Sequence, residues 1–554
     1  MAAYLLFDVF FAVILFLSKR GAWQIFSGLS LVAMLPVLFN SSGRGAVGAF
    51  WGGLFLLGLG YLAFSQKSVF RRIALAIVLA ILTLIIVLAV FQPPFVKTEA
   101  QTFLNDMVPR FAVWSEGWQG FLERPILGWG PENFIVVFSK YFNPCMFSSC
   151  GGEIWFDRVH NIVLDTLVTT GLVGLLSYLA VFGVAIYGLL RSIPKIVERR
   201  YIFFPLGLSV LLLGYFFQNL FVFDMINTYL VFFLSLGFVG FLTRPQVVEE
   251  EARIKRINPV FSFLIVIITI FILWLGNIQP LMANRYLIKT VGAQDAGQAS
   301  LLFKKSLSSW MEKYEPREYF GQKMMRAIDP SIGGKDREIF QTAFDLAESE
   351  MEKSVEQNYL DFRPRLFLGE LYLQSYRFSG NPAKLAAAEQ TLKEAIQLSP
   401  TNQQGYWNLA EIKLAQGKLE ETISLLQTAV NLEPGVGYSH WYLAMAYKIA
   451  GQNELAKEGL NQAEEFGFAW RNNLERLREA IRVYESLGDD NNLLPLYLNA
   501  TELAPDNAQF WASLVATYAN LGQLEKAGEA ARKVIEINPD LRPSVEKFLK
   551  ALPK

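Results

Sequence analysis

The amino-acid sequence predicts an all-helical (all-α) protein in which a bundle of membrane-spanning helices precedes a solenoid of helical repeats. Of its 554 residues, 53% are hydrophobic, and 50 acidic side chains balance 50 basic ones. The charges are unevenly spread, because residues 1–278 hold only 19 basic and 14 acidic residues. Long apolar runs fill this half, whereas the second half has the charge density of a soluble domain. This composition argues against one soluble globule, a disordered chain and a nucleic-acid-binding protein.

Eight apolar runs in the first half are candidate membrane-spanning helices, because a helix needs about 20 apolar residues to cross a bilayer. They lie at about 4–17, 22–39, 46–64, 73–91, 162–190, 202–221, 226–242 and 260–277. We therefore expect residues 1–278 to form a membrane domain with a long loop at about 92–160. A helical connector at 279–358 and a repeat domain at 359–554 are expected to follow.

Basic residues lie in alternate loops between these runs, and this pattern orients the predicted bundle. The positive-inside rule assigns 13 of them to the cytoplasmic side: Lys19, Arg20, Lys67, Arg71, Arg72, Arg191, Lys195, Arg199, Arg200, Arg244, Arg253, Lys255 and Arg256. Eight spans with this polarity place both termini, the long loop and the repeat domain outside the cytoplasm. Because a chain that begins outside with an apolar run is unusual, we expect further helices upstream.

The two cysteines, Cys145 and Cys150, lie in the long loop. An oxidising environment outside the cytoplasm permits a disulfide between them, and two free thiols are the alternative. With only these cysteines and two histidines, His160 and His440, the sequence excludes a disulfide-rich scaffold, a four-cysteine zinc site and a multi-histidine metal site. We expect His440 to pack inside a repeat helix and to carry no chemistry.

The long loop also carries an aromatic helix and a turn-rich segment. Four aromatic residues recur along it at spacings of three or four: Phe111, Trp114, Trp118 and Phe121. They line one face of a helix that we expect to lie in the membrane interface. The segment LGWGPENF follows at 127–134, and FDRVHN then leads directly into the apolar run that begins at 162.

A period of 34 residues runs through the second half and indicates tetratricopeptide repeats, each made of two helices. This period separates Pro400 from Pro434, Trp407 from Trp441 and Gly417 from Gly451. The pattern is strong at 403–436, 437–470 and 508–541 and weaker at 359–400 and 472–506, and residues 285–358 are expected to be degenerate repeats. Such an array presents a groove that can hold a protein partner, whereas packing is the plainer role for its Trp and Tyr residues.

Two residues of the first half are candidates for chemistry. Arg44 stands at the outer start of a span, where its guanidinium can bind a phosphate; an interfacial anchor is the alternative. His160 directly precedes a helix start, where the helix dipole favours a neutral, proton-accepting imidazole; a cap or an anchor is the alternative. Four charges near membrane depth must be either functional or members of ion pairs: Asp157, Arg158, Asp165 and Asp224.

Four segments together resemble the O-antigen ligase and O-antigen polymerase superfamily of membrane glycosyltransferases: SSGRGA, RPILGWGPENF, HNIVLDTLVTTGLVGLLSYL and FQNLFVFD. The resemblance covers roughly residues 22–242. It implies a metal-independent transferase of the GT-C type, without a cofactor, in the plasma (inner) membrane. Such an enzyme takes a glycan from an undecaprenyl-diphosphate carrier on the outer face and passes it to an acceptor hydroxyl.

The resemblance also implies roles for individual residues. Arg44 matches the family's motif arginine and Arg110 a second basic position, so both would bind the diphosphate. Arginines at the interface suit a diphosphate that is tethered to a membrane lipid. His160 matches the family's histidine and would deprotonate or orient the acceptor hydroxyl, which Asp157 would help to orient. Supporting roles would fall to Glu132, Arg158 and Asp224.

The sequence leaves the acceptor open. A lipid acceptor would make the enzyme a ligase, a growing glycan a polymerase, and a Ser or Thr hydroxyl a protein O-oligosaccharyltransferase. The repeat groove favours a protein acceptor or an assembly partner. A membrane-anchored repeat scaffold for cell-envelope assembly is the non-enzymatic alternative, and a transporter ranks last because the centres of the spans are nearly free of charge. Two departures from the family pattern are Gly43, where a serine is usual, and eight spans where ten or more are usual.

Overall fold

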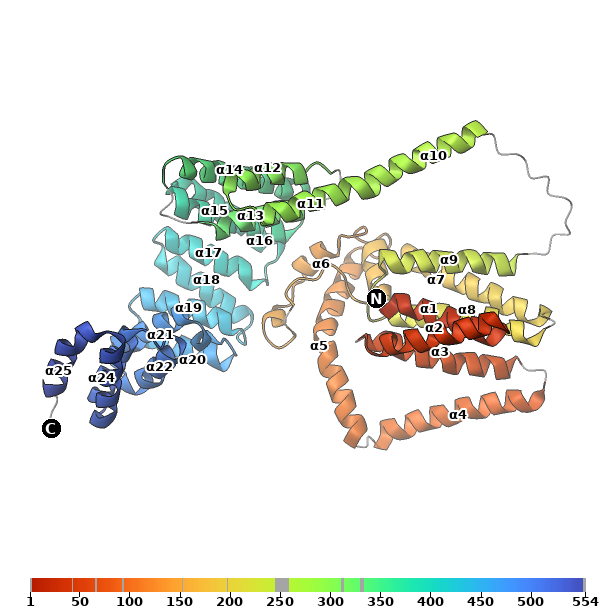
Figure 1. Ribbon diagram of the computed structural model, residues 1–554, viewed down its shortest axis with the longest axis horizontal. Coiled ribbons are helices and arrows are strands. Elements are labelled where there is room, and N and C mark those ends of the chain that lie inside the picture. Colours follow the sequence, from red (N-terminus) through yellow and green to blue (C-terminus); the bar gives the residue numbers. More distant parts are fainter. Residues whose placement is uncertain are drawn as a thin grey trace. The chain divides into compact units, whose positions relative to one another are not determined.

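The computed structural model of the chain describes residues 2–551 with several gaps (Figure 1). The gaps lie at 42, 65–66, 92–93, 152, 197, 245–258, 310–312 and 329–332. All regular secondary structure in the described residues is helical, as the sequence predicts. These helices form two compact units, Met1–Tyr141 with Glu153–Phe261 and Phe142–Gly152 with Ser262–Lys554.

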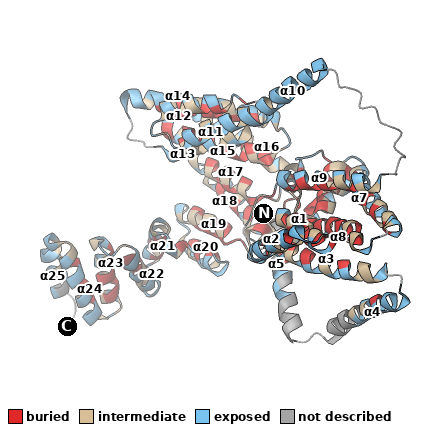
Figure 2. Cartoon of the chain, turned by 45° about the vertical axis from the view of Figure 1, so that its right-hand side comes forward, coloured by how far each residue is buried: buried red, intermediate tan, exposed pale blue. Residues whose placement is uncertain are grey.

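The first unit is a bundle of apolar helices built around α8. Its longer helices are α1 (Ala2–Ser18), α2 (Ala22–Phe39), α3 (Arg44–Ala63), α4 (Ser68–Phe91), α5 (Pro94–Glu123), α7 (Ile162–Ser192), α8 (Phe203–Asn219) and α9 (Ile226–Thr243). α8 packs against α1, α3, α7 and α9. Because its sequence is apolar on every side, Leu208, Leu211 and Leu212 are all fully or nearly fully buried. Buried residues accordingly concentrate on α8 and the helices around it (Figure 2).

Six helices among the described residues are long and apolar enough to cross a membrane: Ala22–Phe39, Arg44–Ala63, Ile162–Lys195, Arg199–Asn219, Ile226–Thr243 and Pro259–Val291. They match six of the eight expected spans, and the chain is a multi-pass membrane protein. The span expected at 4–17 is a shorter apolar helix. The span expected at 73–91 falls within α4, where the side chains from residue 84 onward lie outside the described residues.

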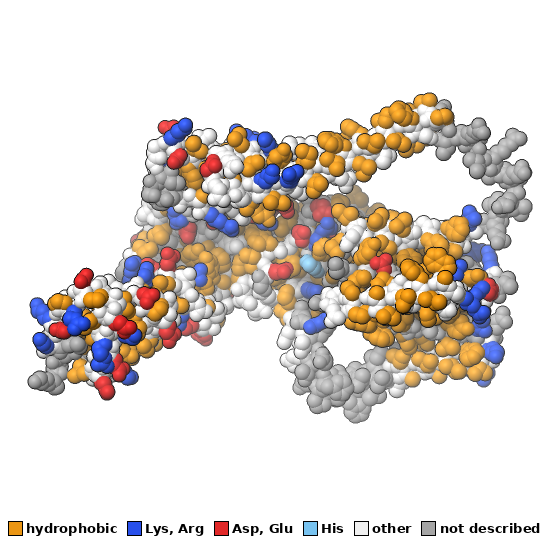
Figure 3. Space-filling model, in the orientation of Figure 1, with side chains coloured by type: hydrophobic (Ala, Val, Ile, Leu, Met, Phe, Trp, Pro, Cys, Tyr) orange, Lys and Arg blue, Asp and Glu red, His pale blue; other side chains and the backbone are white. Residues whose placement is uncertain are grey.

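Apolar side chains cover the outer faces of the spans. In the last span, α10 (Pro259–Leu273) has no buried residue, and apolar side chains cover its surface (Figure 3). Outside a membrane, so large an apolar surface would favour aggregation, whereas lipid chains can cover it without cost. The aromatic helix that we expect in the interface is part of α5, where Phe111 and Trp118 are exposed. Its interfacial position stays a prediction.

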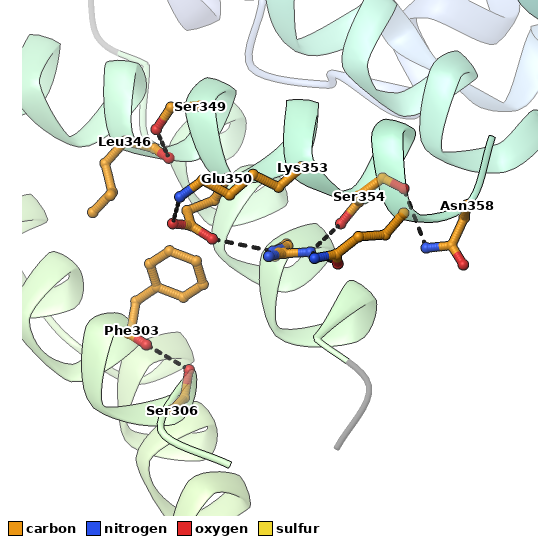
Figure 4. Close-up of polar contacts among 10 residues, drawn as sticks. Phe303, Ser306, Leu346, Ser349, Glu350, Lys353, Ser354 and Asn358 are labelled. Carbon is orange, nitrogen blue, oxygen red and sulfur yellow. Dashed lines mark hydrogen bonds and ion pairs between the residues drawn. The ribbon is translucent and has the colours of Figure 1, made fainter. Parts of the chain in front are cut away.

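In the second unit, α10 continues through a short π-helix (Trp274–Ile278) into α11 (Gln279–Val291), and three further helices follow. These are α12 (Ala296–Ser306), α13 (Tyr314–Arg326) and α14 (Gly334–Gln357). Arg317 of α13 is buried and pairs with Glu350 of α14 at 3.1 Å. Its guanidinium also donates to Ser354 Oγ at 3.1 Å, and Glu350 and Ser354 lie on the same face of α14 (Figure 4). This network holds α13 against α14, and the domain boundaries expected at 279 and 359 stay predictions.

The tetratricopeptide-like repeats that the sequence predicts are present as paired helices. They are α15 (Phe362–Ser379), α16 (Pro382–Leu398), α17 (Gln403–Ala415), α18 (Leu419–Leu432), α19 (Gly437–Ile449), α20 (Asn453–Glu465), α21 (Leu474–Leu487), α22 (Asp490–Leu503), α23 (Ala508–Asn520), α24 (Leu524–Ile537) and the terminal α25 (Arg542–Ala551). Glycines with positive φ, such as Gly417 and Gly451, form the turn inside a pair. Buried alanines, such as Ala410 and Ala444, let neighbouring helices approach closely.

The span α7 is interrupted at Gly171, where φ is 67° and ψ is −167°. An interrupted helix leaves backbone N–H and C=O groups that lipid cannot satisfy. The segment Pro125–Gly130, which follows α5, supplies their partners. It forms four backbone hydrogen bonds with α7: Trp129 N–H to Val168 O at 2.8 Å, Gly130 N–H to Thr169 O at 2.8 Å, Leu172 N–H to Pro125 O at 2.8 Å and Val173 N–H to Ile126 O at 3.4 Å.

Glycine is required on both sides of this junction. A Cβ atom on Gly171 would lie 2.1 Å from the carbonyl oxygen of Ile126, and one on Gly128 would lie 2.5 Å from the carbonyl oxygen of Val168. Both glycines have φ near +70°, a region that other residues rarely adopt. The LGWG segment and the interrupted helix, which are about 40 residues apart in the sequence, therefore form one structural element.

Replacing Gly171 by alanine is expected to destabilise the bundle by about 3 kcal/mol or more, because the backbone strain and the clash with Ile126 add together. Gly183 lies in the same helix and has open space where a Cβ would be, so Gly183→Ala is the matched control. We expect the control to change stability by less than about 0.5 kcal/mol. Thermal unfolding of the detergent-solubilised variants measures both effects, and equal melting temperatures for the two variants would refute this account of the junction.

Candidate functional site

His160 is held at the start of α7 by the local backbone. Its φ of 56° is unusual for a residue with a side chain. The next residue, Asn161, caps the helix, because its Oδ1 accepts the N–H groups of Val163 at 3.0 Å and Leu164 at 3.2 Å. The cap fixes where the helix begins, and this fixes the direction of His160 one residue before it. A strained residue that is held in this way is a feature typical of functional sites.

The ring of His160 lies between two aromatic side chains. Phe156 approaches it at 5.6 Å between ring centroids with an interplanar angle of 83°, and Phe223 at 5.1 Å with 82°. Phe156 belongs to the loop before α7, whereas Phe223 belongs to the turn between α8 and α9. Two edge-to-face contacts from separate segments orient the imidazole and shield part of it from water.

Burial lowers the pKa of His160 below its usual value of 6.5, and the positive charge of Arg110 lowers it further. The carboxylates of Asp157 and Glu153 act in the opposite direction. With the pKa lowered, the imidazole is neutral at physiological pH and can accept a proton. Three of the residues predicted from the sequence, His160, Arg110 and Asp157, thus interact electrostatically in the fold.

Arg158 belongs to an ion-pair cluster beside His160. Its guanidinium pairs with Glu132 and lies 3.6 Å from Oδ2 of Asp165 on α7. Asp165 also accepts the backbone N–H of Val159 at 3.2 Å, so the carboxylate ties the loop before α7 to the first turn of the helix. Glu132 itself has φ of 64° within the turn-rich segment. The two carboxylates thus compensate the charge of Arg158.

Asp224 is the centre of a second network, in the turn between α8 and α9. Its carboxylate accepts hydrogen bonds from the Tyr215 hydroxyl, from Nδ2 of Asn219 at 2.5 Å and from the Tyr178 hydroxyl at 3.4 Å. Burial raises the pKa of Asp224 above its usual value, although each of these hydrogen bonds opposes the rise. The network fixes the turn that carries the neighbouring Phe223, and Phe223 contacts both His160 and the guanidinium of Arg158.

Arg44 is the first residue of α3 and is exposed. The next residue, Gly45, faces the end of α8, since a Cβ there would lie 3.7 Å from Cγ of Gln218. Because Asn219, the last residue of α8, binds Asp224, Arg44 lies at the same end of the bundle as the Asp224 turn. The N-terminus of a helix and a guanidinium both attract anions, so this end of α3 suits a phosphate group.

Arg110 lies on α5 directly after Pro109 and is half-buried. Its Nη1 is 3.9 Å from Sδ of Met107, one turn earlier on the helix. Arg110 remains a candidate for binding an anion, because a guanidinium matches the geometry of phosphate oxygens. Among the described residues, no group of three or more His, Cys, Asp or Glu side chains is placed to hold a metal ion.

Sequence reasoning missed four residues that shape the site: Phe156, Phe223, Tyr215 and Asn219. The segment FQNLFVFD contains two of them and was recognised only as part of a family pattern. Aromatic residues are so frequent in the membrane half that single ones carry no positional signal. Their roles depend on which helices pack together, and one sequence does not contain this information.

Comparison with known families agrees with the two-part architecture. Residues 29–179 match the sequence model of a family described as O-antigen ligase. Residues 383–446 and 496–529 match two models of tetratricopeptide repeats. The O-antigen ligase match includes Arg44, Arg110, Asp157 and His160 and ends before Asp224. No curated protein matches the chain significantly.

Solved structures similar to the chain include YrrB, which is described as a tetratricopeptide-repeat (TPR) protein. YrrB has 21% sequence identity and a TM-score of 0.29, and the match covers 36% of this chain and 98% of YrrB. The pilF protein of Pseudomonas aeruginosa has 16% identity and a TM-score of 0.30, with coverage of 42% and 96%. MamA has 17% identity and a TM-score of 0.26, with coverage of 31% and 96%. The repeats are identified by the two family-model matches and not by these structural similarities.

Proposed function

Since this chain carries an O-antigen ligase domain followed by tetratricopeptide repeats, we propose that it is a ligase-like glycosyltransferase with a lipid-linked donor. It transfers a glycan from a polyprenyl-diphosphate carrier, of the undecaprenyl class, to an acceptor hydroxyl on the outer face of the plasma membrane. The observation that carries the proposal is that burial and the charge of Arg110 lower the pKa of His160, inside the segment that matches the ligase family.

The proposed reaction is one displacement at the anomeric carbon of the donor glycan. The acceptor oxygen forms a bond to this carbon, and the bond from the carbon to the diphosphate oxygen breaks. The lipid diphosphate leaves with the electron pair, and the imidazole of His160 takes the proton of the acceptor hydroxyl. A positioned general base contributes about 10²–10⁴-fold to such a step. Asp157 orients the acceptor or the imidazole from the loop before α7.

Arg44 and Arg110 bind the leaving diphosphate. Charge accumulates on the diphosphate as the glycosidic bond breaks, and a guanidinium aimed at it stabilises the transition state more than the ground state. The two arginines lie on different helices, α3 and α5, so they can hold different oxygens of one diphosphate. No metal ion or cofactor is required in this scheme, because the cationic side chains neutralise the leaving group.

Glu132, Arg158 and Asp224 act as positioning residues in this scheme. The Arg158 cluster holds the loop that carries His160 against α7, and the Asp224 network holds Phe223 against the imidazole. Loss of either network would tilt or free the imidazole without removing the base. Their variants are therefore expected to keep a residual activity that His160 variants lack.

A pocket in the repeat array favours a protein as the acceptor or as an assembly partner. It measures about 330 Å³ and is lined by residues of α15, α17 and α19, among them Glu370, Glu411, Trp407 and Tyr442. Burial raises the pKa of both Glu370 and Glu411. Arg377 forms a long ion pair with Glu411, with 3.7 Å between Nη2 and Oε2. Two carboxylates beside aromatic side chains suit a peptide with a basic residue. A lipid acceptor (ligase), a growing glycan (polymerase) and a scaffold without activity are the alternatives.

The first test is glycan transfer in proteoliposomes that contain a polyprenyl-diphosphate glycan and a candidate acceptor. His160→Asn keeps a residue that tolerates positive φ, so it removes the base without adding backbone strain. We expect His160→Asn to lower the rate by about 10²-fold or more. Arg44→Ala and Arg110→Ala are expected to lower it by about 10²–10³-fold each.

Arg191→Ala is the matched control, because Arg191 is exposed in the last turn of α7, at the end opposite His160. It should transfer glycan at the wild-type rate. The scaffold alternative gains support if His160→Asn and both arginine variants retain full transfer. Activity lost equally in all four variants would indicate a folding defect and would also count against the assigned roles.

The pH dependence of kcat/KM gives a second test. The base must be neutral, so activity falls as the pH drops through the pKa of His160, which lies below 6.5. Asp157→Asn removes a charge that raises this pKa, so the acidic limb should move to lower pH. Arg110→Gln removes a charge that lowers it, so the limb should move to higher pH. Identical acidic limbs in all three proteins would exclude His160 as the base.

The proposed orientation is tested by labelling with a membrane-impermeant maleimide. Asp506→Cys places a thiol in an exposed turn of the repeats, and Lys67→Cys places one in a loop assigned to the cytoplasm. We expect labelling of Asp506→Cys in intact spheroplasts and of Lys67→Cys only after lysis. The opposite pattern would show that the repeats lie in the cytoplasm.

A further inference from the structure

The segment Phe142–Gly152 of the long loop groups with the repeat unit, although the chain before and after it belongs to the first unit. Within it, a disulfide joins Cys145 to Cys150 and closes residues 145–150 into a small ring. Two backbone hydrogen bonds inside the ring, from Ser148 N–H and from Cys150 N–H to the carbonyl of Cys145, are both 2.9 Å long. The segment therefore has a compact structure of its own.

The segment presents two aromatic side chains to the repeats, Phe142 before the ring and Phe147 within it. Phe142 and Phe147 lie 5.3 Å apart, and Phe147 lies 5.1 Å from the indole ring of Trp407 on α17. Phe147 also packs against the repeat core cluster that includes Leu426 and Val436. Phe142, three residues before the ring, is only 2% exposed. Apolar side chains from the loop thus extend a hydrophobic cluster of the repeats.

Polar and backbone contacts give the same interface its register. Thr401, in the turn between α16 and α17, donates its hydroxyl hydrogen to the carbonyl of Phe142 at 2.5 Å. One repeat further, a Cβ on Gly435 would lie 3.7 Å from Cβ of Ser148. Trp407 is itself fixed, because its Nε1 donates to Ser439 Oγ at 3.0 Å. The segment therefore contacts two successive inter-repeat turns, through Phe142 at one turn and Ser148 at the next.

We propose that the disulfide-closed segment Phe142–Gly152 is a built-in ligand of the repeat array and fastens the array to the long loop. Because a protein segment cannot contact a domain across a bilayer, the repeats and the loop lie on the same side of the membrane. Trp407, which the ring contacts, also lines the repeat pocket, so a peptide in that pocket would bind next to the fastened loop. The proposal goes beyond glycan transfer and does not depend on it.

Paired cysteine substitutions in the full-length, membrane-embedded protein test the contact. Cβ atoms 3.7 Å apart fit the geometry of a disulfide, so Ser148→Cys with Gly435→Cys should cross-link under mild oxidation. Asp506 follows Pro505 as Gly435 follows Pro434, so Ser148→Cys with Asp506→Cys is the matched control at the equivalent turn of a distant repeat. Mass spectrometry of tryptic peptides identifies the 148–435 cross-link directly and separates it from the native Cys145–Cys150 pair.

We expect the 148–435 cross-link to form and the 148–506 cross-link to be absent. Adding Phe147→Ala should slow the 148–435 cross-link by about tenfold or more, because the buried aromatic contact is lost. Phe548→Ala, which removes an exposed aromatic side chain of the last helix, should leave the rate unchanged. A monodisperse protein that gives no 148–435 cross-link, or gives both cross-links equally, would overturn the proposal. So would a cross-linking rate that does not respond to Phe147→Ala.

Discussion

The bundle depends on the rule that backbone polar groups inside a membrane must find partners within the protein. α7 breaks its own hydrogen-bond ladder at Gly171, and the segment from Pro125 to Gly130 repairs the break with four hydrogen bonds. This repair joins α5 to α7 and leaves a short first half of α7 ahead of the break. His160 stands at the start of that half, and Arg110 lies on α5, so the same hydrogen bonds that allow the interruption also set the distance between the two residues.

Charges around this junction fall into two kinds. Arg158, Glu132 and Asp165 neutralise one another and hold the loop before α7 in place. Arg110 instead acts on an uncharged imidazole, and it lowers the pKa of His160 instead of forming an ion pair with it. In the proposed reaction, this positive charge is the one that would meet the diphosphate. The same separation distinguishes Asp224, which is committed to three hydrogen-bond donors, from Asp157, which is exposed beside His160.

The sequence predicts the architecture well, because spans and repeats depend on length, apolar content and a period of 34 residues. It also makes Arg44, Arg110 and His160 candidate site residues, because they fall in segments that resemble a known family, and their roles stay predictions. The interruption of α7 was not predicted, since a glycine within an apolar run is common in membrane helices and becomes special only when Pro125–Gly130 packs against it. The contact of Phe147 with Trp407 likewise cannot be predicted from sequence periodicity, because 260 residues separate the partners.

The lowered pKa of His160 gives the proposed reaction an order of events. In the free enzyme, burial and the charge of Arg110 keep the imidazole neutral but make it a weak base. In the proposed scheme, a diphosphate bound at Arg110 would offset that positive charge and raise the pKa of His160 toward its ordinary value. The base would therefore become stronger only when the leaving group is in place. A water molecule that reached the site before the donor would meet a weaker base. The coupling between Arg110 and His160 would thus favour taking a proton from the acceptor hydroxyl after the donor has bound, and not from water before it.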